Sequence, residues 1–300
     1  MIPVEKLWQR AAFLQAIRSF FQQRRYLEVD TPVRLPHLIP EAHIEPVASG
    51  GHFLQTSPEI CMKRLLAAGA ERIFQICPCF RRNERGAYHL PEFLMLEWYR
   101  KGEDYLGLMR ECEDLVRHLA SVLPAEEPGM VKNKPVTLAG PWPRLTVEQA
   151  FRDHAAIPVD QALRQDRFEQ CLVEDIEPHL GVERPTFLVD FPAVLASLAR
   201  LKDSDPGVAE RFELYIGGTE IANGFSELTE SGEQQLRFEI ERKKITEQGR
   251  DPGNMPEEFL RAIDAIDTAA GIALGLDRLL MVLTGAESVD EVIPFKPEDL

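Results

Sequence analysis

The chain has 300 residues, 44% of them apolar and 28% charged, the ordinary composition of a globular protein with one large or two small domains. Its formal net charge of −15 disfavours non-specific binding to nucleic acid, because phosphate contacts need clustered Lys and Arg. No apolar run is long enough to span a membrane, no secretory signal opens the chain, and five cysteines without a CxxC pair fit a reducing cytoplasm.

The first half of the chain predicts helices and strands in an irregular order. Apolar residues in 5–24 recur at steps of four and three, which is the spacing of an amphipathic helix. The prolines of "YLEVDTPVRLP" then favour an extended, edge-like segment. The elements expected after it are a helix ending near Gly69, strands at 72–80 and 92–100, and a long helix at 103–121.

The second half begins with a connection. Residues 122–144 carry five prolines and two glycines, and Thr146 with Gln149 resembles a capping box that opens a helix. Strands and helices alternate without βαβ units, so the expected fold class is α+β. The remaining elements expected are helices at 160–182 and 231–249, a buried strand at 186–192, a hairpin turning at Gly217-Gly218 and a strand-to-helix segment at 271–285.

The stretch "ELYIGGTEIANGFSEL" at 213–228 places three glutamates, Glu213, Glu220 and Glu227, at intervals of seven. The glycine pair between two alternating apolar runs predicts a tight hairpin. We expect Glu213 and Glu220 to lie about opposite one another across it, where two carboxylates repel unless a divalent cation lies between them. Taken alone, these residues also fit exposed acids at a turn.

Two further segments carry chemistry. "FRRNERGAYHLPEFLMLEWYR" at 80–100 is an arginine-bearing strand, a polar loop and a returning strand, and an arginine fork suits phosphate and carboxylate oxygens. "GIALGLDRLLMVLTG" at 271–285 is a glycine-rich strand that turns into a helix, and glycines let a nucleotide approach the backbone. The glycine-rich piece alone also fits tight packing, but the three segments in this order are a specific pattern.

This order resembles the catalytic domain of class II aminoacyl-tRNA synthetases, with motif 1 at 5–36, motif 2 at 80–100 and motif 3 at 271–285. The resemblance implies one catalytic domain over 1–300, an antiparallel β-sheet flanked by helices, and a homodimer formed through motif 1. "SPEICMKRLL" and "GTEIANGFSEL" are most similar to lysyl-tRNA synthetase, although we find no room for that enzyme's N-terminal anticodon-binding domain.

A free-standing lysyl-type catalytic domain is similar to the elongation factor P β-lysine ligase family. That family shares Ala273 in "GIALGLDR", where lysyl-tRNA synthetases have glycine. The resemblance implies an ATP-dependent ligase that activates (R)-β-lysine as an adenylate and transfers it to a lysine of elongation factor P. A lysine–tRNA ligase that lacks the anticodon domain and a non-catalytic amino-acid-binding module are the alternatives, and the acidic balance disfavours tRNA as a partner.

The resemblance also implies roles for individual residues. Arg81 and Arg278 are the expected catalytic residues, Arg81 at the α-phosphate and the substrate carboxylate and Arg278 at the γ-phosphate. Since the usual FRxE of motif 2 is altered here, either Asn83 or Glu84 contacts the adenine amine. The ATP-binding residues implied are Arg81, Arg82, Asn83, Phe93, Glu220, Ile221, Gly275 and Arg278, with magnesium at Glu213 and Glu220.

For the amino acid, the resemblance implies that Glu59 and Glu227 pair with its amino groups. Tyr99 also fits a core aromatic and Asn223 also fits a turn residue. The substrate-binding residues implied are Ser57, Glu59, Tyr99, Asn223, Glu227 and Ala273.

Overall fold

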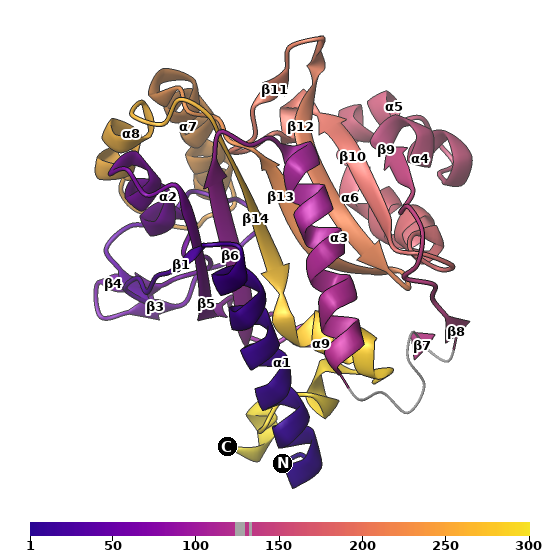
Figure 1. Cartoon of the computed structure of the whole chain (residues 1–300). Coiled ribbons are helices and arrows are strands. Elements are labelled where there is room, and N and C mark those ends of the chain that lie inside the picture. The colour runs from indigo at the N-terminus through magenta and orange to yellow at the C-terminus, as the bar shows by residue number, and fades with distance from the viewer. Residues whose placement is uncertain (124–129, 132–133) are drawn as a thin grey trace.

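A computed structural model describes residues 1–123, 130–131 and 134–300 of the chain (Figure 1). Part of the connection expected at 122–144 therefore lies outside the described residues. The described part of it includes two short paired strands, β7 (Met130–Val131) and β8 (Lys134–Pro135).

A nine-stranded sheet forms the centre of the molecule, in the order β1-β5-β6-β14-β13-β12-β10-β9, with β11 paired to β12. The β1–β5 and β10–β9 pairs are parallel and the other pairs are antiparallel, which confirms the expected α+β fold with an antiparallel sheet. The strands are β1 (Leu27–Glu28), β5 (Arg72–Phe80), β6 (Glu92–Lys101), β9 (Arg144–Thr146), β10 (Thr186–Pro192), β11 (Leu201–Lys202), β12 (Asp205–Ile216), β13 (Thr219–Ser226) and β14 (Ala269–Gly275).

Helices cover one face of this sheet. Figure 1 shows α1 (Val4–Gln23) and α3 (Tyr105–Val122) crossing it, with α9 (Leu276–Thr284) below them. Alternate strand residues such as Trp98, Ile272 and Phe212 point to these helices and are at most 2% exposed. Because this face holds the largest apolar core, the opposite face of the same strands is left for polar chemistry.

The predicted helices at 5–24, 103–121 and 231–249 are confirmed as α1, α3 and α7 (Ser231–Glu247). The predicted capping box is also confirmed, because Thr146 and Gln149 exchange side-chain to backbone hydrogen bonds at the start of α4 (Val147–His154). The helix ending near Gly69 is α2 (Glu59–Ala67), and α8 (Glu257–Ile263) was not predicted. The extended segment after α1 contributes β2 (Arg34–Leu35) to a small sheet with β3 (Ala48–Ser49) and β4 (His52–Leu54).

The prediction that residues 160–182 are helical is confirmed for most of the segment, which is divided into short pieces. These are α5 (Val159–Arg164), α6 (Phe168–Cys171), a π-helical turn (Leu172–Ile176) and a 3-10 turn (Glu177–His179). The first break coincides with Asp166 at a positive φ of 54°, which no continuous helix accommodates. The described helices include none that is both long and apolar enough to cross a membrane.

Candidate active site

The open face of the sheet carries a row of polar residues across four neighbouring strands. Glu97 on β6 pairs in register with Ala273 on β14, Ala273 with Asn223 on β13, and Asn223 with Glu213 on β12. Side chains directly opposite each other in a sheet lie on the same face. The predicted site residues Ala273, Asn223 and Glu213 are therefore neighbours, and Glu97 joins them although the sequence analysis did not single it out.

The expected pairing of Glu213 with Glu220 is wrong. The hairpin turn at Gly217-Gly218 is confirmed, with φ of 60° and 70°, but Glu220 pairs with Tyr215, and a bulge between Leu214 and Tyr215 shifts Glu213 to Asn223. The bulge adds one residue to β13, so that Glu220 and Asn223, three residues apart, point to the same face. Both acids still reach one site, diagonally across the hairpin.

A cavity of about 580 Å³ lies over this face. Its lining also includes Arg211 and Glu41, which were not predicted. Ser57, Glu59, Tyr99 and Glu227 are not among its lining residues and lie in a closed cluster beside it. The predicted residues that line it are Arg81, Phe93, Glu213, Glu220, Ile221, Asn223, Ala273, Gly275 and Arg278.

Two arginines, Arg81 and Arg278, line the cavity. Arg278 at the start of α9 donates from Nε to the Tyr88 carbonyl (3.0 Å) and from Nη1 to Oε2 of Glu220 (3.2 Å). The guanidinium of Arg81 lies 5.2 Å from the centre of the Phe93 ring, which is within cation–π range. Two cations beside an aromatic ring suit an anionic ligand that carries a planar base.

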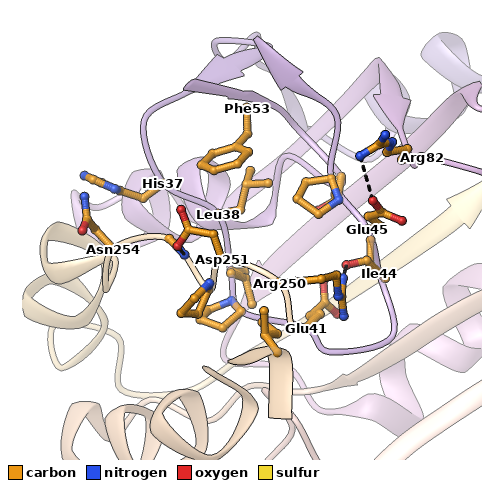
Figure 2. A pocket seen from close by; sticks show the side chains of 17 residues that line it. His37, Leu38, Glu41, Ile44, Glu45, Phe53, Arg82, Arg250, Asp251 and Asn254 are labelled. Atoms are coloured by element: carbon orange, nitrogen blue, oxygen red, sulfur yellow. Dashed lines mark hydrogen bonds and ion pairs between the residues drawn. The ribbon is translucent and has the colours of Figure 1, made fainter. Parts of the chain in front are cut away.

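Arg82 and Asn83 point elsewhere. Arg82 Nη1 and Asn83 Nδ2 each donate to the carboxylate of Glu45 (both 2.9 Å), and neither residue lines the active-site cavity. Figure 2 shows Arg82 and Glu45 beside a second, smaller cavity of about 290 Å³. Glu84, the alternative adenine contact, does line the active-site cavity, and its Oε1 lies 3.8 Å from Nη1 of Arg81.

Asp277 ties the three predicted motifs together. Its carboxylate lies 2.7 Å from Arg10 of α1 and accepts the backbone N–H of Leu94 of β6 (2.7 Å). Asp277 is only 4% exposed, and a buried carboxylate is stable when it is paired and hydrogen-bonded. These contacts hold the N-terminal end of α9, and with it Arg278, against β6, the strand that carries Phe93.

The closed cluster contains an unpredicted cation, Lys63. Its Nζ lies 2.5 Å from Oε1 of Glu59 and 2.5 Å from Oε2 of Glu227, and its side chain is 2% exposed. Burial lowers the pKa of Lys63, but the two carboxylates raise it further, and the result is above the usual value. Lys63 is therefore charged. In the sequence, the contact between Lys63 and Glu59 could have been expected from their spacing of four residues on α2.

Glu97 completes the cluster. It accepts hydrogen bonds from the hydroxyl groups of Ser57 and Tyr99, the latter at 2.8 Å. Gly271 lies beneath, and a side chain there would collide with the Tyr99 ring and with Oε1 of Glu227 at about 2.4 Å. Glu97 and Tyr99 alternate along β6, so both point to the open face.

The three carboxylates outnumber the single ammonium. Burial, with a further contribution from Glu59, raises the pKa of Glu97 to about 8. Burial also raises the pKa of Glu227 to about 8, although Lys63 opposes that shift. Perturbed carboxyl groups of this kind are typical of functional sites, and a bound cation would stabilise their ionised form.

Glu213 is also perturbed. Arg211 donates to its Oε1 (2.6 Å) and the Tyr215 hydroxyl donates to its Oε2 (2.7 Å). Burial raises its pKa to about 7 against the effect of Arg211, and the charge of Glu220 adds to the rise. Two carboxylates that disfavour each other's charge beside a cavity suit a divalent cation, which would remove that cost.

Comparisons with known proteins agree with this geometry. The family model for class II tRNA synthetases (D, K and N) matches residues 4–299. The chain is 39% identical over 98% of its length to a protein of Klebsiella pneumoniae subsp. pneumoniae, and 40% identical to proteins of Salmonella gallinarum (97%) and Edwardsiella ictaluri (98%). The match covers 95% of each relative, and all three carry the name "Elongation factor P--(R)-beta-lysine ligase".

Proposed function

The chain belongs to the class II tRNA synthetase family and, within it, to the elongation factor P–(R)-β-lysine ligases, and on that premise we propose that it attaches (R)-β-lysine to a lysine of elongation factor P. The observation that carries the proposal is the cross-strand row from Glu97 to Glu213. This row joins a closed, acid-rich cluster suited to ammonium groups with the cavity that Arg81 and Arg278 line.

The reaction has two steps. In the first, the carboxylate of β-lysine attacks the α-phosphorus of ATP, which releases pyrophosphate and leaves a β-lysyl adenylate on the enzyme. In the second, the ε-amine of the acceptor lysine attacks the carbonyl carbon of this mixed anhydride, which forms an amide and releases AMP. The protein contributes positioning and charge stabilisation rather than covalent chemistry.

Arg81 and Arg278 are the catalytic residues in this proposal, because both guanidinium groups line the cavity and both suit phosphate oxygens. Phe93, Ile221 and Gly275 line the same cavity and would contact the nucleotide. Arg82 and Asn83, which Glu45 holds in this structure, would reach ATP only after leaving that carboxylate.

Glu213 and Glu220 would hold magnesium. Their carboxylates face the same cavity, and the charge of Glu220 adds to the cost of ionising Glu213, which a divalent cation would offset. A bound magnesium ion would neutralise charge on the phosphate groups of ATP.

The amino-acid end would be built from Ser57, Glu59, Tyr99, Asn223, Glu227 and Ala273, as the sequence predicts, together with Glu97. Each carboxylate that Lys63 contacts has a second oxygen, and Oε1 of Glu227 has no hydrogen bond within the described residues. These oxygens are the proposed partners of the two ammonium groups of β-lysine.

The molecule would act as a single catalytic domain and as a homodimer. Trp8 on α1 and Leu27 on β1, both in motif 1, are 73% and 61% exposed, and large exposed apolar residues mark interaction surfaces. The five free cysteines support a cytoplasmic location.

The test is to incubate the protein with ATP, labelled (R)-β-lysine and either elongation factor P or bulk tRNA. Label on elongation factor P supports the proposal. Label on tRNA alone identifies a lysine–tRNA ligase, and binding of β-lysine without ATP–pyrophosphate exchange identifies a non-catalytic module.

A further inference from the structure

Segment 41–44 separates the two cavities. Glu41 and Ile44 line both the active-site cavity and the smaller cavity of about 290 Å³, where Figure 2 shows them beside Arg250. Arg250 donates to the carbonyls of Ala42 and Ile44, and Ala42 N donates to the carboxylate of Glu241 on α7 (2.9 Å). The backbone next to Glu41 is therefore held from α7 and from the segment that follows it.

The carboxylate of Glu41 is half-buried and has no hydrogen bond or ion pair with any described residue. The charged groups that act on it come from four elements: Glu59 of α2, Arg81 at the end of β5, Glu241 of α7 and Arg211 of β12. Glu41 lines the same cavity as Arg81, the proposed ligand of the α-phosphate and the substrate carboxylate, so it borders the space in which the reacting atoms would lie.

The other carboxylates on the cavity are either engaged or exposed. Glu84, Glu213, Glu220, Glu241 and Asp277 all have cationic partners within 4 Å. Asp166 and Glu169 have none, but both are exposed to solvent. Glu41 is thus the half-buried carboxylate of this cavity whose oxygens are free.

We propose that Glu41 is the general base of the transfer step, accepting the proton that the incoming lysine ammonium must lose before it can attack. This inference rests on the proposed function. An unperturbed lysine has a pKa near 10.4, so at pH 7 only about one in 2,500 is an uncharged amine. A base beside the adenylate that takes this proton as the amine attacks raises the rate of the step.

The step balances as follows in atoms and charge. The ε-ammonium gives one proton to the Glu41 carboxylate, and the uncharged amine attacks the carbonyl carbon of the adenylate. The C–N bond forms, the C–O bond to the phosphate of AMP breaks with its electron pair leaving on AMP, and the nitrogen loses its second proton to water.

The environment of Glu41 suits this role. Burial, then the charge of Glu59, raises the pKa of Glu41 to about 7, against the opposing effect of Arg81. A general base works best when its pKa lies near the operating pH. His43 on the same segment and His89 of motif 2 also line the cavity. Partial burial, and then the charge of Arg211 at His43 and of Arg278 at His89, lowers the pKa of each below its usual value, which makes them weaker bases.

The test compares two nucleophiles on the same enzyme. Adenylate formed on wild type, Glu41→Gln and Glu41→Asp is allowed to react in a single turnover with elongation factor P or with hydroxylamine, which is already uncharged at pH 7. The quantity measured is the rate of transfer to elongation factor P divided by the rate of transfer to hydroxylamine. A variant that forms less adenylate lowers both rates equally, so the ratio reports the transfer step alone. Asp251→Asn is the matched control, because this carboxylate lines only the second cavity and accepts a hydrogen bond from Gly253 N that asparagine retains.

Glu41→Gln is expected to lower the ratio about 100-fold at pH 7, Glu41→Asp to recover part of it, and Asp251→Asn to leave it at the wild-type value. The wild-type transfer rate should level off above pH 7 to 8, whereas in Glu41→Gln it should keep rising toward the pKa of lysine. A ratio in Glu41→Gln that equals the wild-type ratio overturns the inference. So does a roughly 100-fold lower ratio in His43→Gln when Glu41→Gln keeps the wild-type ratio. Absence of transfer by wild type overturns the proposed function, and the inference with it.

Discussion

The Nζ atom of Lys63 lies 2.5 Å from Oε2 of Glu227, and both side chains are almost fully buried, at 2% and 1% exposed. This pair joins α2 to the end of β13. Removing one partner of a buried ion pair leaves an uncompensated charge, which costs about 3 to 5 kcal/mol.

Lys63→Met is therefore expected to lower the free energy of unfolding by about 3 kcal/mol, as measured by urea denaturation. The double variant Lys63→Met/Glu227→Gln should be less destabilised than Lys63→Met, because Glu59 is then the one carboxylate of the two that has lost its partner. A double variant that is less stable than the single one would show that Lys63 acts through packing alone.

The affinity for β-lysine should depend on pH. Burial raises the pKa of Glu227, a proposed partner of an ammonium group, and of Glu97 in the same cluster to about 8, so both groups are mostly protonated at pH 6. A protonated Glu227 cannot form an ion pair with the substrate, and a protonated Glu97 adds no negative charge beside it. The KM for (R)-β-lysine in ATP–pyrophosphate exchange should fall at least about tenfold between pH 6 and pH 8, while the substrate ε-ammonium stays charged. A constant KM over this range would mean that neither group meets the substrate.

Arg278→Ala should reduce ATP–pyrophosphate exchange by about 100- to 1,000-fold, the usual loss when a preorganised donor is removed from a charged transition state. The far-UV circular dichroism spectrum should match that of wild type, since Asp277, not Arg278, ties α9 to β6. Exchange near the wild-type rate in a folded variant would exclude motif 3 from the mechanism.

Glu213→Gln and Glu220→Gln should each raise the magnesium concentration that gives half-maximal adenylate formation. The bulge in β13 brings both carboxylates to one face of the sheet beside the cavity. Magnesium titrations of the two variants that overlay the wild-type curve would assign these acids to the structure instead, Glu213 through Arg211 and Tyr215.

Ala273→Gly should narrow the preference for (R)-β-lysine over α-lysine. Ala273 lies between Glu97 and Asn223 in register, so its methyl group fills space beside both. One methyl group in a tight pocket contributes about 1 to 3 kcal/mol of discrimination. The measurement is kcat/KM for adenylation of both amino acids by both proteins. A wild type that prefers α-lysine would contradict the assignment of the substrate.

Much of the site could be predicted from sequence because its residues occur in short motifs. Arg81, Phe93 and Arg278 were predicted from their local segments, and the cavity does bring them together. Lys63, Glu97 and Glu41 were not predicted from the sequence, because each residue type is common in its local context without any function. In sequence they resemble a lysine on a helix surface, a glutamate in a strand and an acid in a loop. What distinguishes them is burial and proximity to residues far away in the chain.

Local patterns by themselves determined many, though not all, of the helices and strands of this protein. The capping box at Thr146 and the glycine pair at 217–218 depend on interactions within a few residues, so they could be read directly from the sequence. The α+β class followed from the order of those elements.

Only the tertiary structure decided how the acids are used. Because β13 has one extra residue, Glu220 lies on the same face of the sheet as Asn223. Because α2 packs against the sheet, Lys63 lies between Glu59 and Glu227. Register, bulges and buried charge pairs depend on contacts between distant segments, and the free energy of a carboxylate depends on the solvent that those contacts exclude. Spacing along the chain carries neither quantity, so the three regularly spaced glutamates acquire different partners only once the sheet has formed.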